Sequence, residues 1–336
     1  MIYKSIQTVL MLCMVSDKQR LKINIKNSRY MKQFENYRRQ FTILLGLCVL
    51  LFITISSVSA QSFDDLNQLE DYQIKTYYSE GSKENAKTMA SRSDNVISFY
   101  KSLIDFEPTV TLLVLSPADW SKYTNFPFYG MPHYTSGQTL IVASEDNDFW
   151  KSFIPPLDQL PSELAQQISS AYSDNNNGLS MRAFFDLLAI HELGHIFHIQ
   201  GGLKMQRKWM GELFSNIFLH TYIAEKEPEL LPALTVFPKM VVSSTKKGEL
   251  KYTTLNELES NYDIISQQYP NNYGWYQCRW HIAAANIYDE GGISAFKNLW
   301  QELKNQIEPL DDAAFATLLS TKVHLSVADV LLKWDE

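Results

Sequence analysis

The chain has 336 residues, of which 45% are hydrophobic and 20% are charged, and its net charge is −7. This composition is typical of a globular protein and excludes both a disordered chain and one wholly embedded in a membrane. The net acidity, together with the lack of a basic stripe, also argues against nucleic acid as a partner.

The N-terminal segment predicts export. Residues 41–55 are apolar, follow Arg38 and Arg39, and lead into small residues that end at Ala60. A basic segment, an apolar stretch and small residues at the end are the three parts of a secretory signal peptide. We therefore expect a periplasmic or extracellular protein.

The start of this signal divides the chain into three parts. Met31 opens a basic segment of normal length, whereas a start at Met1 makes that segment about forty residues long. We assign residues 1–30 to an upstream extension without function, residues 31–60 to a signal peptide cleaved before Gln61, and residues 61–336 to the catalytic domain.

The rival interpretation is an uncleaved anchor, because residues 41–60 reach the roughly 20 residues that span a bilayer. The membrane would be a partner only in that case. After cleavage, Cys278 is the single cysteine, so the chain can form no internal disulfide and no cysteine-based zinc site. Residues 61–336 carry 21 basic and 35 acidic side chains, a net charge of about −14.

The first part of the exported chain predicts strands and one helix. Residues 61–71 are polar and predict a flexible start, and residues 74–78 predict a short strand. A helix is expected over 83–104, followed by strands over 109–115 and 138–144. Residues from Trp209 onward are almost all helical in pattern, so strands come early and helices late. That order predicts an α+β fold with a helical C-terminal part.

A buried helix over residues 181–200 carries the most informative motif. Its sequence HELGH reads H-E-x-x-H. On a helix, His191 and His195 lie one turn apart on the same face, where both imidazoles can reach one zinc ion. Glu192 then lies beside the metal and can act as a general base toward a zinc-activated water.

The residues around this motif indicate that its match to H-E-x-x-H is not accidental. Random order would give roughly 0.008 occurrences in a chain of this composition. The helix is too apolar for a surface helix, Ser180 is suited to cap its start, and Gly201 to end it. The alternative is a solvated helix face that matches the motif without binding metal.

Two histidines and a water leave one position for a third protein ligand. The segment 208–216 offers Glu212, which lies 17 residues after His195 at the start of another apolar helix. Here the chain resembles the gluzincin metallopeptidases, the thermolysin-like clan, in which a glutamate of a second helix in an E-x-x-S-D pattern completes the zinc site. By that resemblance Glu212 is the third ligand.

Ser215 and Asn216 stand at the Ser and Asp positions of this pattern. Asn216 replaces the usual aspartate, and an amide can accept an imidazole N–H without supplying charge. The alternative for both residues is an ordinary polar side chain in a helix.

Other histidines and acids near the motif are less suited to bind zinc. His198 is three residues from His195 and is favoured as a core or rim histidine. His220 and Glu225 lie further along the second helix and are fallback ligands.

The resemblance also implies a donor for the oxyanion that develops on the carbonyl oxygen. Gluzincins use a tyrosine or a histidine from a late helix. The segment 273–280 resembles the start of that helix, with Tyr273 and Tyr276 as candidates and His281 as a further one. Plain core tyrosines are the alternative for both.

The resemblance predicts a zincin-like catalytic domain with a small N-terminal mixed sheet, an active-site helix and a helical C-terminal part. Residues 139–144 would form the edge strand along the cleft, where an extended peptide can pair with it. The implied protein is an exported Zn²⁺-dependent peptidase that acts on a peptide or protein. The G-x-M-E-N segment of gluzincin aminopeptidases is absent, which favours an endopeptidase.

Two alternatives remain open. One is a catalytically silent binding or assembly protein on a zincin scaffold, although Glu192, the residue whose loss would most simply inactivate the enzyme, is present. The other is a zinc hydrolase of a non-peptide amide or ester, which the same residues could serve.

Overall fold

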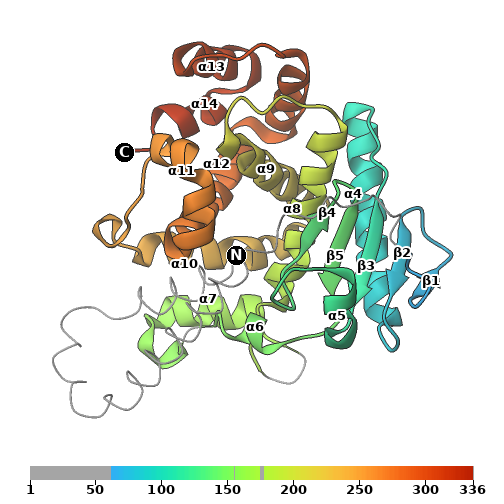
Figure 1. The fold of residues 1–336 in the computed structure, drawn as a ribbon. Coiled ribbons are helices and arrows are strands. Elements are labelled where there is room, and N and C mark those ends of the chain that lie inside the picture. Colours follow the sequence, from blue (N-terminus) through green and yellow to red (C-terminus); the bar gives the residue numbers. More distant parts are fainter. Residues whose placement is uncertain (1–61, 155, 175–177, 336) are drawn as a thin grey trace. The chain divides into compact units, whose positions relative to one another are not determined.

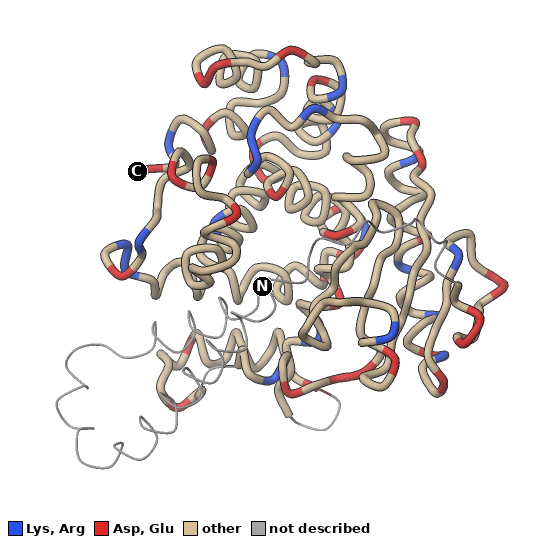
Figure 2. The backbone as a smooth tube through the Cα atoms, viewed as in Figure 1, with Lys and Arg blue, Asp and Glu red and all other residues tan. Residues whose placement is uncertain are grey.

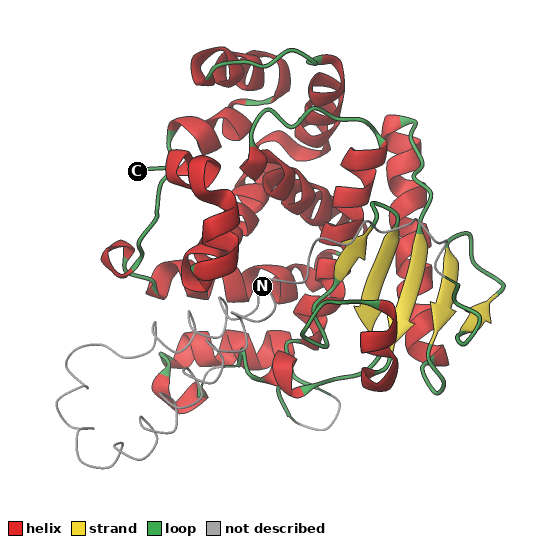
Figure 3. Ribbon diagram, viewed as in Figure 1, coloured by secondary structure: helices red, strands yellow, loops and turns green. Residues whose placement is uncertain are grey.

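The computed structural model describes residues 62–154, 156–174 and 178–335. The extension at 1–30 and the signal peptide at 31–60 lie outside the described residues and stay predictions. Residues from Leu66 onward form one compact unit with a sheet followed by a mainly helical part (Figures 1 and 3). Within the described ranges, none of the helices has the length and apolarity needed to cross a membrane.

A five-stranded mixed sheet forms the N-terminal part of this unit. Its order is β1-β2-β3-β5-β4, in which β2, β3 and β5 are parallel and the two edge strands are antiparallel to their neighbours. The strands are β1 (Asn67–Leu69), β2 (Lys75–Tyr78), β3 (Thr111–Leu115), β4 (His133–Thr135) and β5 (Thr139–Ala143).

The three longer strands confirm the predictions over 74–78, 109–115 and 138–144. Two other predictions about this region are wrong. Residues 61–71 are not wholly a flexible start, because β1 pairs with β2 and buries Leu69. The strand over 139–144 is not at the edge, because β5 lies between β3 and β4, and β4 is the edge strand next to α8 (Figure 1).

Helix α4 (Lys83–Ile104) has the bounds that the sequence predicts. Its buried residues recur at helical spacing, including Met89, Val96 and Tyr100; the helix packs against β2 and β3, and the Tyr100 ring stacks on Phe218 of the later helical part. The first helix therefore covers the sheet and leaves its polar face to solvent.

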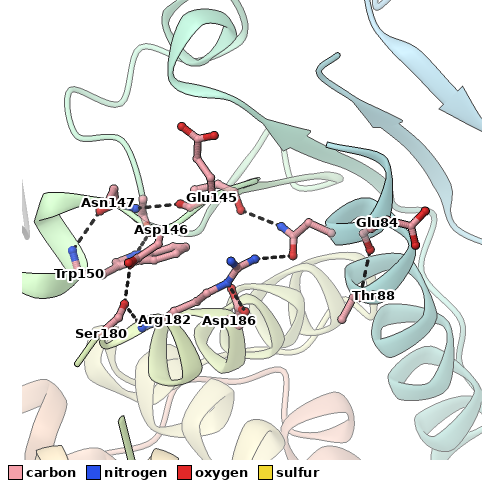
Figure 4. Close-up of polar contacts among 12 residues, drawn as sticks. Glu84, Thr88, Glu145, Asp146, Asn147, Trp150, Ser180, Arg182 and Asp186 are labelled. Atoms are coloured by element: carbon pink, nitrogen blue, oxygen red, sulfur yellow. Dashed lines mark hydrogen bonds and ion pairs between the residues drawn. The ribbon is translucent and has the colours of Figure 1, made fainter. Parts of the chain in front are cut away.

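Helix α8 (Arg182–Gln200) also confirms its prediction, and it lies between the sheet and the later helices (Figure 1). Its N-terminal end is joined to the sheet by polar contacts (Figure 4). Arg182 donates to Asn85 at 2.7 Å and Asn85 donates to the Ala143 carbonyl of β5 at 3.3 Å, while the Ser180 hydroxyl donates to Asp146 at 2.6 Å. These contacts fix the start of α8 relative to the end of β5.

Helices make up the remainder of the chain, as the sequence pattern predicts. Helix α9 (Lys208–Lys226) packs against α8 on one side and most extensively against α12 (Pro270–Asn305). Basic and acidic residues are interspersed along this part of the chain (Figure 2). The other helices are α5 (Pro117–Tyr123), α6 (Asp148–Lys151), α7 (Ser162–Tyr172), α10 (Leu231–Ser244), α11 (Leu255–Gln268), α13 (Asp312–Leu318) and α14 (Leu325–Leu332).

Candidate metal centre

Three side chains from α8 and α9 converge on one point. His191 and His195 come from successive turns of α8, and Glu212 comes from the first turns of α9. The two imidazole Nε2 atoms are 3.1 Å apart, and the Glu212 Oε2 atom lies 3.3 Å from the Nε2 of His191 and 3.6 Å from that of His195. Among the described residues, these three form the group that could hold a metal ion.

The spacing of these atoms fits a tetrahedral zinc site. Bonds of about 2.0 to 2.2 Å at tetrahedral angles place neighbouring ligand atoms roughly 3.3 to 3.6 Å apart. The three measured separations, 3.1, 3.3 and 3.6 Å, fall on or near this range. Two imidazoles and one carboxylate are also a ligand set that zinc uses in catalytic sites.

A close approach of the two helices brings Glu212 to the histidines. Gly194 lies inside the motif, and a Cβ atom there would be 3.1 Å from the Ser215 Cα atom of α9 and 3.2 Å from its hydroxyl. Only the absence of a side chain at Gly194 allows the backbones to lie this close. Ser215 is fully buried at this contact, and its hydroxyl has no hydrogen-bond partner. Its observed role is to pack against α8.

The charges in the cluster are coupled. Burial opposes a charge on Glu212, but the charge on His195 and the hydrogen bonds from both histidines outweigh it and hold the pKa of Glu212 well below its usual range. Burial likewise opposes protonation of His195, yet Glu212 raises its pKa, whereas burial lowers the pKa of His191. The Glu212 carboxylate and the two imidazoles therefore stabilise one another's charges at the point where a cation would lie.

Glu192 lies next to the first histidine on α8. Burial raises its pKa to about 8, the charge on His195 lowers it, and Glu212 raises it further. A carboxyl group with a pKa near neutrality can both accept and return a proton, which is the property that a general base and later acid needs.

Neutral donors from the C-terminal helices surround the Glu212 carboxylate. Its Oε1 atom accepts from the Tyr262 hydroxyl at 2.8 Å and from the Tyr273 hydroxyl at 3.2 Å. Its Oε2 atom accepts from the Gln277 Nε2 atom at 2.9 Å. Glu212 is thus held by α11 and α12 as well as by its own helix.

The second nitrogen of each histidine ligand has its own neighbour. An interaction with the Asn216 side chain raises the pKa of His191, in opposition to burial. Among the described residues, the buried His191 Nδ1 and Asn216 Oδ1 atoms have no hydrogen-bond partner, and the Asn216 amide donates to the Glu212 carbonyl at 3.0 Å. On the other ligand, the His195 Nδ1 atom is 3.0 Å from the His198 Nε2 atom. Burial and the charge on His195 lower the pKa of His198 to about 3, so its neutral ring can accept from His195.

The two predicted oxyanion donors lie in different places. Tyr273 reaches the cluster, but its buried hydroxyl donates to Glu212. Tyr276 does not reach it, although residues three apart share one face of a helix. Its hydroxyl donates to the Thr254 carbonyl at 2.7 Å, and its ring stacks on Trp334.

The remaining candidates lie outside the ligand group. The ring of His281 is buried 6.4 Å from that of His191, and burial holds its pKa well below the usual range. His220 lies against the Tyr288 ring, and Glu225 accepts from the Tyr288 hydroxyl at 2.8 Å.

Sequence reasoning missed three residues of the site. Tyr262 and Gln277 contact Glu212, and Tyr134 of the edge strand β4 places its ring 5.4 Å from that of His195. Burial and the carboxylates of Glu192 and Glu212 raise the pKa of Tyr134 to about 12, so the hydroxyl stays protonated. The one signal available in the sequence for Tyr134 was its position in an aromatic segment just before a predicted strand.

The site thus combines three ligand atoms at zinc spacing, an adjacent carboxylate with a raised pKa, and neutral donors from distant helices. Comparison with known proteins adds no relative: no protein-family model, no curated protein and no solved structure matches the chain.

Proposed function

We propose that the protein is an exported zinc-dependent peptidase of the gluzincin kind. The observation that carries the proposal is the spacing of the His191, His195 and Glu212 ligand atoms, which matches the edges of a zinc tetrahedron. When bound, zinc would supply a Lewis acid and lower the pKa of a water molecule. The fold supports the proposal through an antiparallel edge strand beside the helix that carries both histidines.

Glu192 is the general base of the proposed reaction. It takes the proton from the attacking water and returns it to the leaving nitrogen of the peptide. Its place on α8, directly after His191, puts the carboxylate beside the ligand group for both transfers.

Tyr134 is the oxyanion donor of the proposed reaction, in place of Tyr273 and Tyr276, whose hydroxyls are engaged elsewhere. Its ring lies against His195, and its protonated hydroxyl can donate. Loss of one such donor costs about 10² to 10³ in rate. We expect Tyr134→Phe to lower kcat to this extent with unchanged zinc content, whereas Tyr276→Phe leaves kcat unchanged. Equal kcat in Tyr134→Phe and the parent would remove Tyr134 from this role.

The substrate is an extended peptide, and an endopeptidase is favoured. β4 pairs with β5 on one side only and lies next to α8, so its outer edge suits pairing with a substrate strand.

The deciding experiment is metal analysis of the secreted chain together with hydrolysis of a peptide library, with and without chelator. We expect about one zinc per molecule and cleavage that chelator abolishes. Zinc binding without cleavage of any peptide would favour a binding protein, and cleavage of esters or non-peptide amides alone would favour the other hydrolase.

A further inference from the structure

The hydrogen bonds on Glu212 are divided unequally between its two oxygens. Oε1 accepts two, from the hydroxyls of Tyr262 and Tyr273. Oε2 accepts one hydrogen bond from the C-terminal helices, from Gln277, and its other side faces the two histidine Nε2 atoms.

A carboxylate oxygen has two lone-pair positions for hydrogen bonds or metal. The two tyrosines fill both positions on Oε1, and Gln277 leaves one position open on Oε2. We propose that Tyr262 and Tyr273 are positioning residues that occupy Oε1, so that Glu212 binds the metal through Oε2 alone. This inference rests on the proposed zinc site.

This arrangement sets how many oxygens Glu212 can supply to the metal, and so the coordination number. A carboxylate can bind a metal through one oxygen or through both. Two histidines and one oxygen leave a fourth position of a tetrahedral site for water or substrate, whereas a second oxygen from Glu212 would fill it. Occupying Oε1 therefore keeps a position available for chemistry.

The type of donor matters as well. Hydroxyl and amide groups are neutral, so the negative charge of Glu212 remains for the cation. A lysine or arginine in the same place would form an ion pair with the carboxylate and compete with the metal.

The backbone of α11 and the residue spacing on α12 place these donors beside Glu212. Tyr262 directly follows a break in α11 at Asn261, whose backbone has non-helical angles (φ −124°, ψ 23°). Tyr273 and Gln277 are one turn apart on α12, and the Gln277 amide also donates to the Tyr273 hydroxyl at 2.9 Å. The Tyr262 and Tyr273 hydroxyls are 3.2 Å apart, so the three donors form one connected group.

The test replaces zinc by Co²⁺ in the full-length chain, because the visible absorption of Co²⁺ reports its coordination number. The variants are Tyr262→Phe, Tyr273→Phe and the double variant. Tyr172→Phe is the matched control, since it removes a buried tyrosine hydroxyl that donates to the Ala233 carbonyl, away from the site.

We expect the double variant to bind Co²⁺ about 10- to 100-fold more weakly than the parent, the usual cost of losing outer partners of a metal ligand. Its visible bands should also weaken, as they do when Co²⁺ goes from four to five ligands. The control should keep the affinity and the spectrum of the parent.

A double variant with the parental spectrum and affinity would overturn the inference while leaving the zinc site intact. Failure of the parent to bind Co²⁺ or zinc would instead overturn the metal site itself. If the double variant does not fold, Tyr262→Phe, a change at a half-buried position, gives the same comparison.

Discussion

Both halves of α9 carry a glutamate, but the two glutamates lie in different surroundings. In the first half, Glu212 faces two histidines of α8 and accepts hydrogen bonds from α11 and α12. In the second half, burial lowers the pKa of His220 to about 4, and Glu225 accepts from an exposed part of α12. The difference shows that ligand-type residues form a group that could hold a metal ion only where several helices converge on one point.

The largest effect that separates the metal-site cluster from the second half of α9 is expected in catalysis, where Glu192 of α8 acts beside that cluster. Glu192→Gln keeps the size and the hydrogen-bonding ability of the side chain but removes the base, so the rate of peptide cleavage should fall roughly 10²- to 10⁴-fold. Glu225→Gln makes the same chemical change in the second half and should leave the rate unchanged. The measurement is kcat at equal zinc content. A Glu192→Gln variant that cleaves at the parental rate would contradict the proposed mechanism.

Zinc affinity should also fall for a substitution in the first half of α9 and not for one in the second half. Glu212→Gln removes the charged ligand and should weaken zinc binding by more than about 100-fold, the upper end of the cost of losing an outer partner. Glu225→Gln should bind zinc as the parent does. Competition with a chelator of known affinity measures both, and equal affinities would remove Glu212 from the site.

The close approach of α8 and α9 predicts a smaller effect on stability. Gly194→Ala places a Cβ atom against the α9 backbone, so the free energy of unfolding should fall by about 1 to 3 kcal/mol. Gly211→Ala is the matched control, because its Cβ atom would meet the nearest atom, His198 Nε2, at an ordinary 3.6 Å. That change should stabilise α9 by up to about 1 kcal/mol. Urea unfolding tests the pair, and the reverse order of stabilities would show that the helices do not depend on Gly194.

The metal-free protein should also show a pH dependence of its stability. The pKa of Glu192 is raised to about 8 from 4.5, so the folded state holds a proton that the unfolded state releases. This contribution to stability is fully present below about pH 4.5 and is lost as the pH rises through 8. Glu192→Gln should therefore be more stable than the parent above pH 8 and lose that advantage toward pH 4.5. Melting temperatures of both proteins in chelator, measured across this range, check the sign.

The local parts of the site could be predicted from the sequence. The spacing of His191 and His195 is a property of one helix, and an apolar helix with defined ends predicts burial of both, which the structure confirms. Helix α4 and the three longer strands follow from the same short-range patterns. The prediction of Glu212 as third ligand needed the resemblance to gluzincins, because the sequence does not show which face of a second helix contacts α8.

The parts that depend on packing could not be predicted. Tyr262 and Gln277 lie 50 and 65 residues from Glu212 in the sequence, and no periodicity shows which faces of α11 and α12 meet α9. The resemblance predicts the edge strand at 139–144, and the sequence does not reveal β4 beyond it, because three residues are too few for an alternating pattern. Tyr273 and Tyr276 share one helix face and both are buried, and spacing alone does not tell which of the two hydroxyls reaches Glu212.

The distance along the chain between Glu212 and Gln277 has a consequence for synthesis. A ribosome adds about 5 to 20 residues per second, so several seconds pass between the emergence of Glu212 and that of its last donor. During that time the carboxylate has no α12 to bury it, and the nascent protein cannot hold the site in its final form. Metal loading should therefore follow completion of the polypeptide, and a chain truncated before α11 should be recovered without zinc.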